Sequence, residues 1–273
     1  MHFGAHQDLE LLGLLVAAGG LLVLAPALRV PLPILLVLGG VAMGFVPGLP
    51  HVALPPAVIL VAVLPPLLYS GAFFTSLRDL RANKRPISLL AFGLVGATMA
   101  TVGVVAHEWV HLSWAVAFTL GAIVSPTDAL AATEITRRLG APRRIVSIIE
   151  GESLVNDGIA LVIYKAAVTA AVAGTFSLWG ASWRLVVNVI GGIAVGLAVG
   201  YVVRQIRRRV DDPPTEVAIA LLSGYLAYLP AAAIGVSGVL AAVTIGVYMG
   251  WYTPQLTTVE TRLSGNAFWE ILV

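Results

Sequence analysis

Two short segments place acidic side chains inside otherwise apolar stretches of the chain. The first is Ser125–Asp128, and the second is Glu150–Leu161, which contains Glu152, Asn156 and Asp157. A charge in hydrocarbon costs roughly 2.5–3.5 kcal/mol on membrane-insertion scales, so acids at this depth need a function or a partner. A carboxylate there can hold a proton or a small cation, because burial favours its protonated form and a nearby cation favours its ionised form.

The first segment predicts a broken helix. Pro126 has no backbone N–H, and its ring crowds the carbonyl of Ala122, four residues earlier. Carbonyls freed in this way are tolerated at membrane depth only where protein buries them or a wet cavity faces them. Such carbonyls and the Asp128 carboxylate are oxygen ligands that suit a hard cation such as Na⁺. The alternative is an inert proline kink in which Asp128 bonds to the backbone.

The second segment predicts a polar helix surface at the same depth. Ser153 and Asp157 are four residues apart and share one helix face, while Glu152 and Asn156 share the adjacent face. Asp157 lies roughly nine residues into its predicted span, about 13 Å along the helix axis, so it sits near the midplane. Asp128 is at a similar depth in an antiparallel span. Two polar centres at one depth, one beside a broken helix, are typical of a transporter site; the alternative is an inert, buried Asp157.

Glu152 is one position away from the Ser153–Asp157 face, and we interpret it as one member of a structural ion pair. No basic residue at a matching depth stands out in the sequence, so its partner is predicted to lie outside these 273 residues. Lys165 lies about 12 Å beyond Asp157 along the axis. We interpret Lys165 as an anchor that reaches toward the membrane surface.

The composition identifies the class of protein that carries these segments. Hydrophobic residues make up 59% of the chain and charged residues 11%, and the mean hydropathy is +0.95. A soluble fold cannot hide that much apolar surface, and a disordered chain would be far more polar. The 16 Lys and Arg residues form short clusters, which is not the pattern of a nucleic-acid surface. The chain is therefore predicted to be an all-α polytopic membrane protein.

About nine apolar runs are long enough to cross a bilayer. They lie near residues 8–29, 31–48, 53–76, 86–107, 113–135, 148–173, 181–204, 214–232 and 236–253. A tenth run opens at Asn266 and continues to Val273, so we expect a chain that is incomplete at its C-terminus. Except for Lys165 and Arg184, the Lys and Arg residues lie in alternate loops. That pattern predicts cytoplasmic basic loops and an N-terminus outside the cell.

Two further patterns bear on packing and on metal binding. Gly192, Gly196 and Gly200 recur at every fourth position, which predicts close approach of another helix. His107 and His111 with the glutamate between them match the H-E-x-x-H signature of zinc proteases. The match falls where the fourth span leaves the membrane, and no third ligand is evident. We therefore expect no metal at His107 and His111, and no cofactor.

Four motifs together resemble the monovalent cation–proton antiporters, specifically the subfamily of Na⁺/H⁺ exchangers. They are Leu64–Tyr69, Ser125–Asp128, Arg138–Arg143 and Glu150–Asp157. The resemblance implies about 12–13 helices in two inverted repeats, with a dimerisation bundle and a moving core. Residues 1–273 would be a single transmembrane exchanger domain whose second repeat is incomplete. Residues 113–175 would form the first half of the ion-binding core.

The resemblance also implies roles for individual residues. Asp157 would bind the cation or the proton, and Asp128, Thr127 and Ser153 would complete the coordination. Asn156 would be the neutral member of the Asn-Asp pair. An arginine in the missing part of the core would pair with Glu152. Some relatives carry an acid where this chain has Ser70, so a further acidic contribution to the site is in doubt.

The resulting prediction is a secondary transporter, not an enzyme, that exchanges Na⁺ for H⁺ across the cell membrane by alternating access. K⁺ and Li⁺ are alternative ions, one charge each way is the expected stoichiometry, and the resemblance implies a homodimer in the lipid bilayer. Nucleic acid is not an expected partner. The alternatives are a passive cation channel or an intramembrane protease, which would use either zinc or a dyad of Asp128 and Asp157.

Overall fold

The computed structural model is entirely helical wherever it describes regular structure, which confirms the all-α prediction for that part of the chain. The residues it describes are 5–28, 30, 32–45, 58–127, 132, 135, 136, 139–173, 178–210 and 212–272. The chain divides into two compact units, the first made of residues 1–56 and 130–140, and the second of residues 57–129 and 141–273.

The first unit contains two apolar helices, α1 (Ala5–Leu28) and α2 (Leu32–Gly44), which pack against each other. Gly39 of α2 lies directly against the Leu21 side chain of α1. Most described side chains on both helices are exposed. Such apolar exposure is expected of helices surrounded by lipid, where hydrocarbon replaces water as the solvent.

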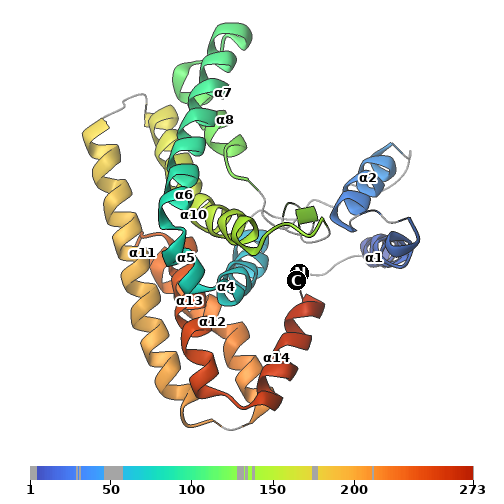
Figure 1. Cartoon of the computed structure of the whole chain (residues 1–273). Coiled ribbons are helices and arrows are strands. Elements are labelled where there is room, and N and C mark those ends of the chain that lie inside the picture. The colour runs from blue at the N-terminus through green and yellow to red at the C-terminus, as the bar shows by residue number, and fades with distance from the viewer. Residues whose placement is uncertain are drawn as a thin grey trace. The chain divides into compact units, whose positions relative to one another are not determined.

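The second unit holds the remaining helices (Figure 1). In chain order these are η1 (Ile59–Val63), α4 (Leu64–Phe74), α5 (Leu77–Ala82), α6 (Lys84–Ser88), η2 (Leu89–Leu94), α7 (Val95–Val110), α8 (Trp114–Val124), α10 (Arg143–Ala173), α11 (Leu178–Arg207), α12 (Pro213–Ala233), α13 (Gly238–Leu256) and α14 (Val259–Leu272). The elements η1 and η2 are π-helical, a wider winding that is often found at functional sites.

Three described helices are long and apolar enough to cross a membrane. They cover Lys84–Val110, Val186–Arg207 and Pro213–Ala233, and they coincide with three of the predicted spans. The first is continuous from α6 through η2 to α7. The remaining predicted spans, and the inverted repeat, stay predictions. The run predicted from Asn266 lies within helix α14, which begins at Val259, and Thr258 just before this helix accepts a hydrogen bond from the Thr261 N–H.

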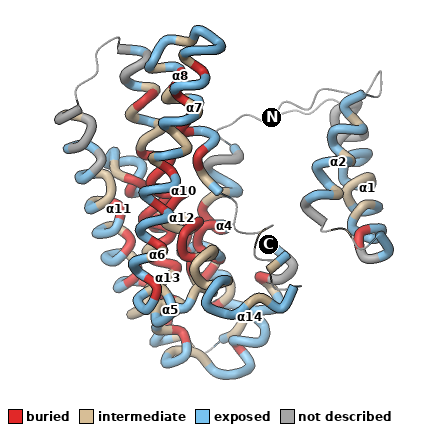
Figure 2. The backbone as a smooth tube through the Cα atoms, turned by 45° about the horizontal axis from the view of Figure 1, so that its top comes forward, coloured by how far each residue is buried: buried red, intermediate tan, exposed pale blue. Residues whose placement is uncertain are grey.

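The largest buried cluster joins α4, α11, α12, α13 and α14. Figure 2 shows buried positions concentrated on α4, α10, α12 and α13 within the second unit. Within this cluster, three side chains are fully buried: Tyr69 of α4 and Ile245 and Met249 of α13. Trp269 of α14 packs against Tyr69, with 5.7 Å between the two ring centroids. Gly246 allows this approach, since an added Cβ would lie 2.6 Å from the Tyr69 carbonyl oxygen.

The glycine stripe of α11 faces α13, which confirms the prediction of close helix packing. A Cβ on Gly192 would lie 2.6 Å from the Ser237 carbonyl oxygen, and one on Gly196 would lie 2.6 Å from that of Ala241. Neither distance is compatible with a side chain, so only glycine lets the two backbones come this close.

A second group of contacts positions α8 and α10. A Cβ on Gly121 of α8 would lie 2.6 Å from the Met99 carbonyl oxygen of α7. At the start of α10, the Arg144 Nε–H donates to the Asn83 side-chain oxygen at 3.2 Å, which joins α10 to the connection between α5 and α6. Gly151 of α10 packs against Ile87 of α6. The start of α10 and the end of α8 are therefore held from several directions.

A substitution of Gly196 tests the α11–α13 packing. Gly196→Ala forces a methyl group against a backbone carbonyl, and overpacking of this kind costs about 1–3 kcal/mol. Thermal unfolding of the purified protein in detergent should shift to a lower temperature. Gly96→Ala is the matched control, because no atom lies within 4 Å of the added Cβ. Equal unfolding temperatures for the two variants would contradict the packing described.

Candidate functional site

Helix α8 stops in the middle of the predicted fifth span, beside Pro126. The helix ends at Val124, and residues 125–127 are not helical. The buried Ser125 hydroxyl donates to the Ala122 carbonyl oxygen at 3.2 Å. This is the carbonyl that Pro126 deprives of its helical donor, and the sequence did not predict that Ser125 would bond to it. Asp128, a predicted ligand, lies outside the described residues.

Thr127 joins the end of α8 to α10. Its hydroxyl donates to the Glu152 carboxylate, 2.8 Å from Oε2 and 3.0 Å from Oε1. Its carbonyl oxygen accepts a hydrogen bond from the Ser153 hydroxyl at 2.9 Å. Consecutive residues of α10 therefore bind both the side chain and the backbone of a single non-helical residue, so the structure brings together three of the predicted site residues.

Asn156, one turn along α10 from Glu152, completes a polar group that consists of Thr127, Glu152, Ser153 and Asn156. Its Nδ2 donates to Glu152 Oε1 at 3.0 Å and to Thr127 Oγ1 at 3.2 Å. The side chain is fully buried, and its Oδ1 has no hydrogen-bond partner among the described residues. An unpaired buried carbonyl oxygen costs about 1–3 kcal/mol, and it is a ligand that a hard cation accepts. The backbone of Asp157 lies in α10, but its side chain is outside the described part of the structure.

Glu152 is the acceptor at the centre of the polar group. The residue is 6% exposed, and its carboxylate accepts hydrogen bonds from the neutral donors of Thr127 and Asn156. The predicted ion pair with an arginine stays a prediction. The i, i+4 spacing of Glu152 and Asn156 was visible in the sequence, but the contact of both with Thr127 was not.

A cavity of about 400 Å³ adjoins the end of α8. It is lined by Ala122 and Pro126 at the end of α8, by Ala160 and Tyr164 of α10, and by Leu64 of α4. The rest of the lining is apolar and consists of Leu68, Ile123, Leu161 and Val239. The cavity therefore reaches Pro126, the residue that precedes Thr127 in the chain.

The two histidines of the zinc-like motif have different environments. His107 Nδ1 donates to the Leu112 carbonyl oxygen at 2.8 Å, and its ring stacks on Trp114 at 3.9 Å between centroids. His111 caps the end of α7 in a left-handed conformation with φ of 58°. The second histidine has therefore left the helix, so the two rings do not share the helical face that the motif requires.

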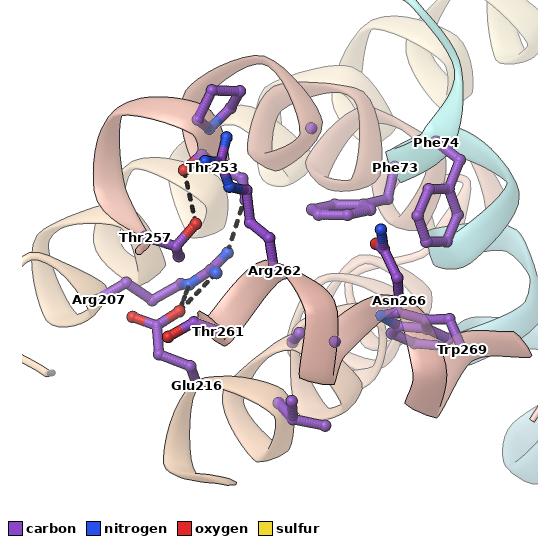
Figure 3. Close-up of a pocket in the computed structure, with 15 residues that line it drawn as sticks. Phe73, Phe74, Arg207, Glu216, Thr253, Thr257, Thr261, Arg262, Asn266 and Trp269 are labelled. Carbon is purple, nitrogen blue, oxygen red and sulfur yellow. Dashed lines mark hydrogen bonds and ion pairs between the residues drawn. The ribbon is translucent and has the colours of Figure 1, made fainter. Parts of the chain in front are cut away.

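A buried ion pair that the sequence did not predict lines a separate cavity of about 220 Å³ (Figure 3). Arg207 Nε and Nη2 both lie 2.5 Å from Glu216 Oε2, and Nη1 donates to Thr253 Oγ1 at 3.2 Å. Figure 3 shows Phe73 and Trp269 across the cavity from this pair. The pair connects the end of α11 to the start of α12 and, through Thr253, to α13. Removal of either charged partner would leave the other charge buried and uncompensated, which would destabilise the protein.

The chain belongs to the sodium/hydrogen exchanger family, whose transmembrane region it matches over residues 13–273. It is therefore a membrane protein of a transporter family. An uncharacterized Na⁺/H⁺ exchanger of Mycobacterium tuberculosis is 39% identical over 255 residues, which cover 91% of this chain and 46% of that protein. A sodium, potassium, lithium and rubidium/H⁺ antiporter of Bacillus pumilus is 36% identical over 224 residues, covering 80% of this chain and 33% of that protein.

The fold is also that of a solved exchanger. The sodium proton antiporter MjNhaP1 from Methanocaldococcus jannaschii at pH 8 superposes with a TM-score of 0.71 and 22% sequence identity, covering 96% of this chain and 67% of that one. The chain spans about half the length, or less, of the curated relatives named above.

The Thr127 hydroxyl offers a direct test of the polar group. Thr127→Val keeps the shape of the side chain but leaves the buried Glu152 carboxylate without one donor, so the protein should lose about 1–3 kcal/mol of stability. Chemical unfolding in detergent measures the loss. Thr119→Val on α8 is the control, because within the described residues that hydroxyl bonds only to the Ala115 carbonyl of its own helix. A loss no greater than that of Thr119→Val would show that the bond to Glu152 contributes no stability.

Proposed function

We propose that the protein containing this chain is a secondary transporter that exchanges Na⁺ for H⁺ across the cell membrane by alternating access. One observation carries the proposal: the interrupted end of α8 is bonded to the polar turn of α10, where Asn156 Oδ1 is buried and has no hydrogen-bond partner among the described residues. Membership of the sodium/hydrogen exchanger family supports the same activity.

The binding site in this proposal is Asp157 with Asp128, Thr127, Ser153 and Asn156. A carboxylate near the membrane midplane takes either a proton or a cation, because each one reduces the affinity for the other. If only the loaded core moves between the two faces of the membrane, this competition becomes obligatory exchange. Asn156 is neutral beside Asp157, which favours exchange of one positive charge for one.

The remaining architecture follows from the same proposal. Residues 113–175 form the first half of a moving core, and the helices around α13 belong to the support on which it moves. Cytoplasmic basic loops, an external N-terminus and a homodimer are part of the proposal. The Bacillus pumilus relative is named for sodium, potassium, lithium and rubidium, so K⁺ and Li⁺ are to be tested alongside Na⁺.

Replacement of the central carboxylate is the decisive test. Asp157→Asn in the full-length protein removes the group that holds both ions, so Na⁺-driven proton movement should fall to background. Addition of Na⁺, K⁺ or Li⁺ to proteoliposomes that contain a pH-sensitive dye measures the exchange. Asn188→Ala on α11 is the control for a polar substitution away from the site. Exchange that survives Asp157→Asn would overturn the assigned role, and single-channel currents without proton coupling would replace the exchanger with a channel.

Chain length gives a second test. The curated relatives named above are at least about twice as long as the part that matches this chain, and we propose that exchange needs a core built from both parts. Residues 1–273 alone, reconstituted in the same vesicles, should therefore give no Na⁺-driven proton flux. Robust flux from these residues, absent from empty vesicles, would show that they contain a complete transport unit.

A further inference from the structure

Two consecutive prolines open helix α4 inside the predicted third span. Pro65 and Pro66 occupy the first turn of α4, directly after the π-helical turn η1. Because Pro66 has no N–H, it cannot donate to the carbonyl of Ala62, four residues earlier, as an ordinary helical residue would. At membrane depth no water is present to replace that donor, so the protein itself must supply one.

Tyr225 of α12 supplies this donor. Its hydroxyl donates to the Ala62 carbonyl oxygen at 2.5 Å, a contact between residues 163 positions apart. The adjacent Gly224 makes the approach possible, because an added Cβ there would lie 2.6 Å from the Pro65 carbonyl oxygen. The pair Gly224 and Tyr225 therefore fits the proline turn in both shape and hydrogen bonding.

The turn that Tyr225 holds leads directly into one wall of the cavity beside the candidate site. Leu64 and Leu68 are one helical turn apart at the start of α4, and both line the 400 Å³ cavity opposite Pro126. The next residue, Tyr69, is fully buried in the cluster formed with α12, α13 and α14. A shift of the η1–α4 turn would therefore move the surface that faces the interrupted end of α8.

We propose that Tyr225 is a positioning residue for exchange: its hydroxyl supplies the hydrogen bond that Pro66 withdraws from Ala62, and this bond holds the α4 wall against which the α8–α10 pair works. The inference rests on the proposed function. Tyr225 is not one of the residues of the proposed ion site, so its loss should slow the movement of the loaded core without changing the affinity of the site.

A double-mutant cycle separates this role from general packing. Tyr225→Phe removes only the hydroxyl, while Pro66→Ala restores a backbone N–H that can donate to Ala62. In the full-length protein, Tyr225→Phe should lower the folding equilibrium constant about fivefold, which corresponds to one ordinary net hydrogen bond. In the Pro66→Ala background the same substitution should have little effect. Chemical unfolding in detergent gives all four corners of the cycle.

Transport kinetics provide the second readout. Tyr225→Phe should lower the maximal exchange rate severalfold and leave the Na⁺ concentration for half-maximal rate unchanged, and Pro66→Ala/Tyr225→Phe should recover the rate of Pro66→Ala alone. Tyr228→Phe is the control, one turn along the same helix, because its ring packs near Gly238 and no hydrogen bond of its hydroxyl joins it to η1 or α4 within the described residues.

Three outcomes would overturn the assignment: a Tyr225→Phe protein that matches Tyr228→Phe in stability and rate, an equal defect in both Pro66 backgrounds, or a change in Na⁺ affinity at constant maximal rate. If the unaltered protein shows no exchange at all, the proposed function fails. The stability cycle would still decide whether Tyr225 replaces the donor that Pro66 lacks.

Discussion

The structure depends on the requirement that polar groups at membrane depth find partners within the protein, because hydrocarbon offers none. The requirement is most demanding where a helix is interrupted. At the end of α8, Ser125 bonds to the carbonyl that Pro126 deprives of its donor, and Ser153 of α10 bonds to the carbonyl of Thr127. These bonds stabilise the non-helical residues 125–127 that follow the apolar helix α8.

The same requirement explains the polar group around Glu152. A buried carboxylate is costly unless it accepts hydrogen bonds, and Thr127 and Asn156 both donate to it. Asn156 uses its amide nitrogen in this way, and within the described part of the chain its Oδ1 has no hydrogen-bond partner. One residue therefore stabilises the buried Glu152 carboxylate and, in the proposed function, offers an oxygen to the ion. The hydrogen-bond donor Nδ2 and the candidate ligand atom Oδ1 belong to the same amide group of Asn156.

Prolines recur in this architecture with their missing donors replaced from elsewhere. The donor that Pro126 lacks is replaced by the hydroxyl of the neighbouring Ser125, whereas the donor that Pro66 lacks is replaced by the hydroxyl of Tyr225 on α12. The second solution also joins α4 to α12, and the glycines of α11 and α13 bring their neighbours close enough for a continuous core. At the other end of these helices, the Arg207–Glu216 pair connects α11, α12 and α13. Together these contacts form a support next to the cavity beside α8.

The sequence by itself determined the class of protein, the family, the all-helical fold and the close packing along Gly192, Gly196 and Gly200, because composition, motif spacing and the periodicity of one helix contain that information. It also placed Thr127, Ser153 and Asn156 near one another by resemblance. Only the tertiary structure decided which atoms meet: Thr127 with Glu152, Tyr225 with Ala62, and Arg207 with Glu216. The physical reason is that a hydrogen bond between helices depends on their relative axial shift and rotation. The period of 3.6 residues describes each helix alone and leaves both quantities open.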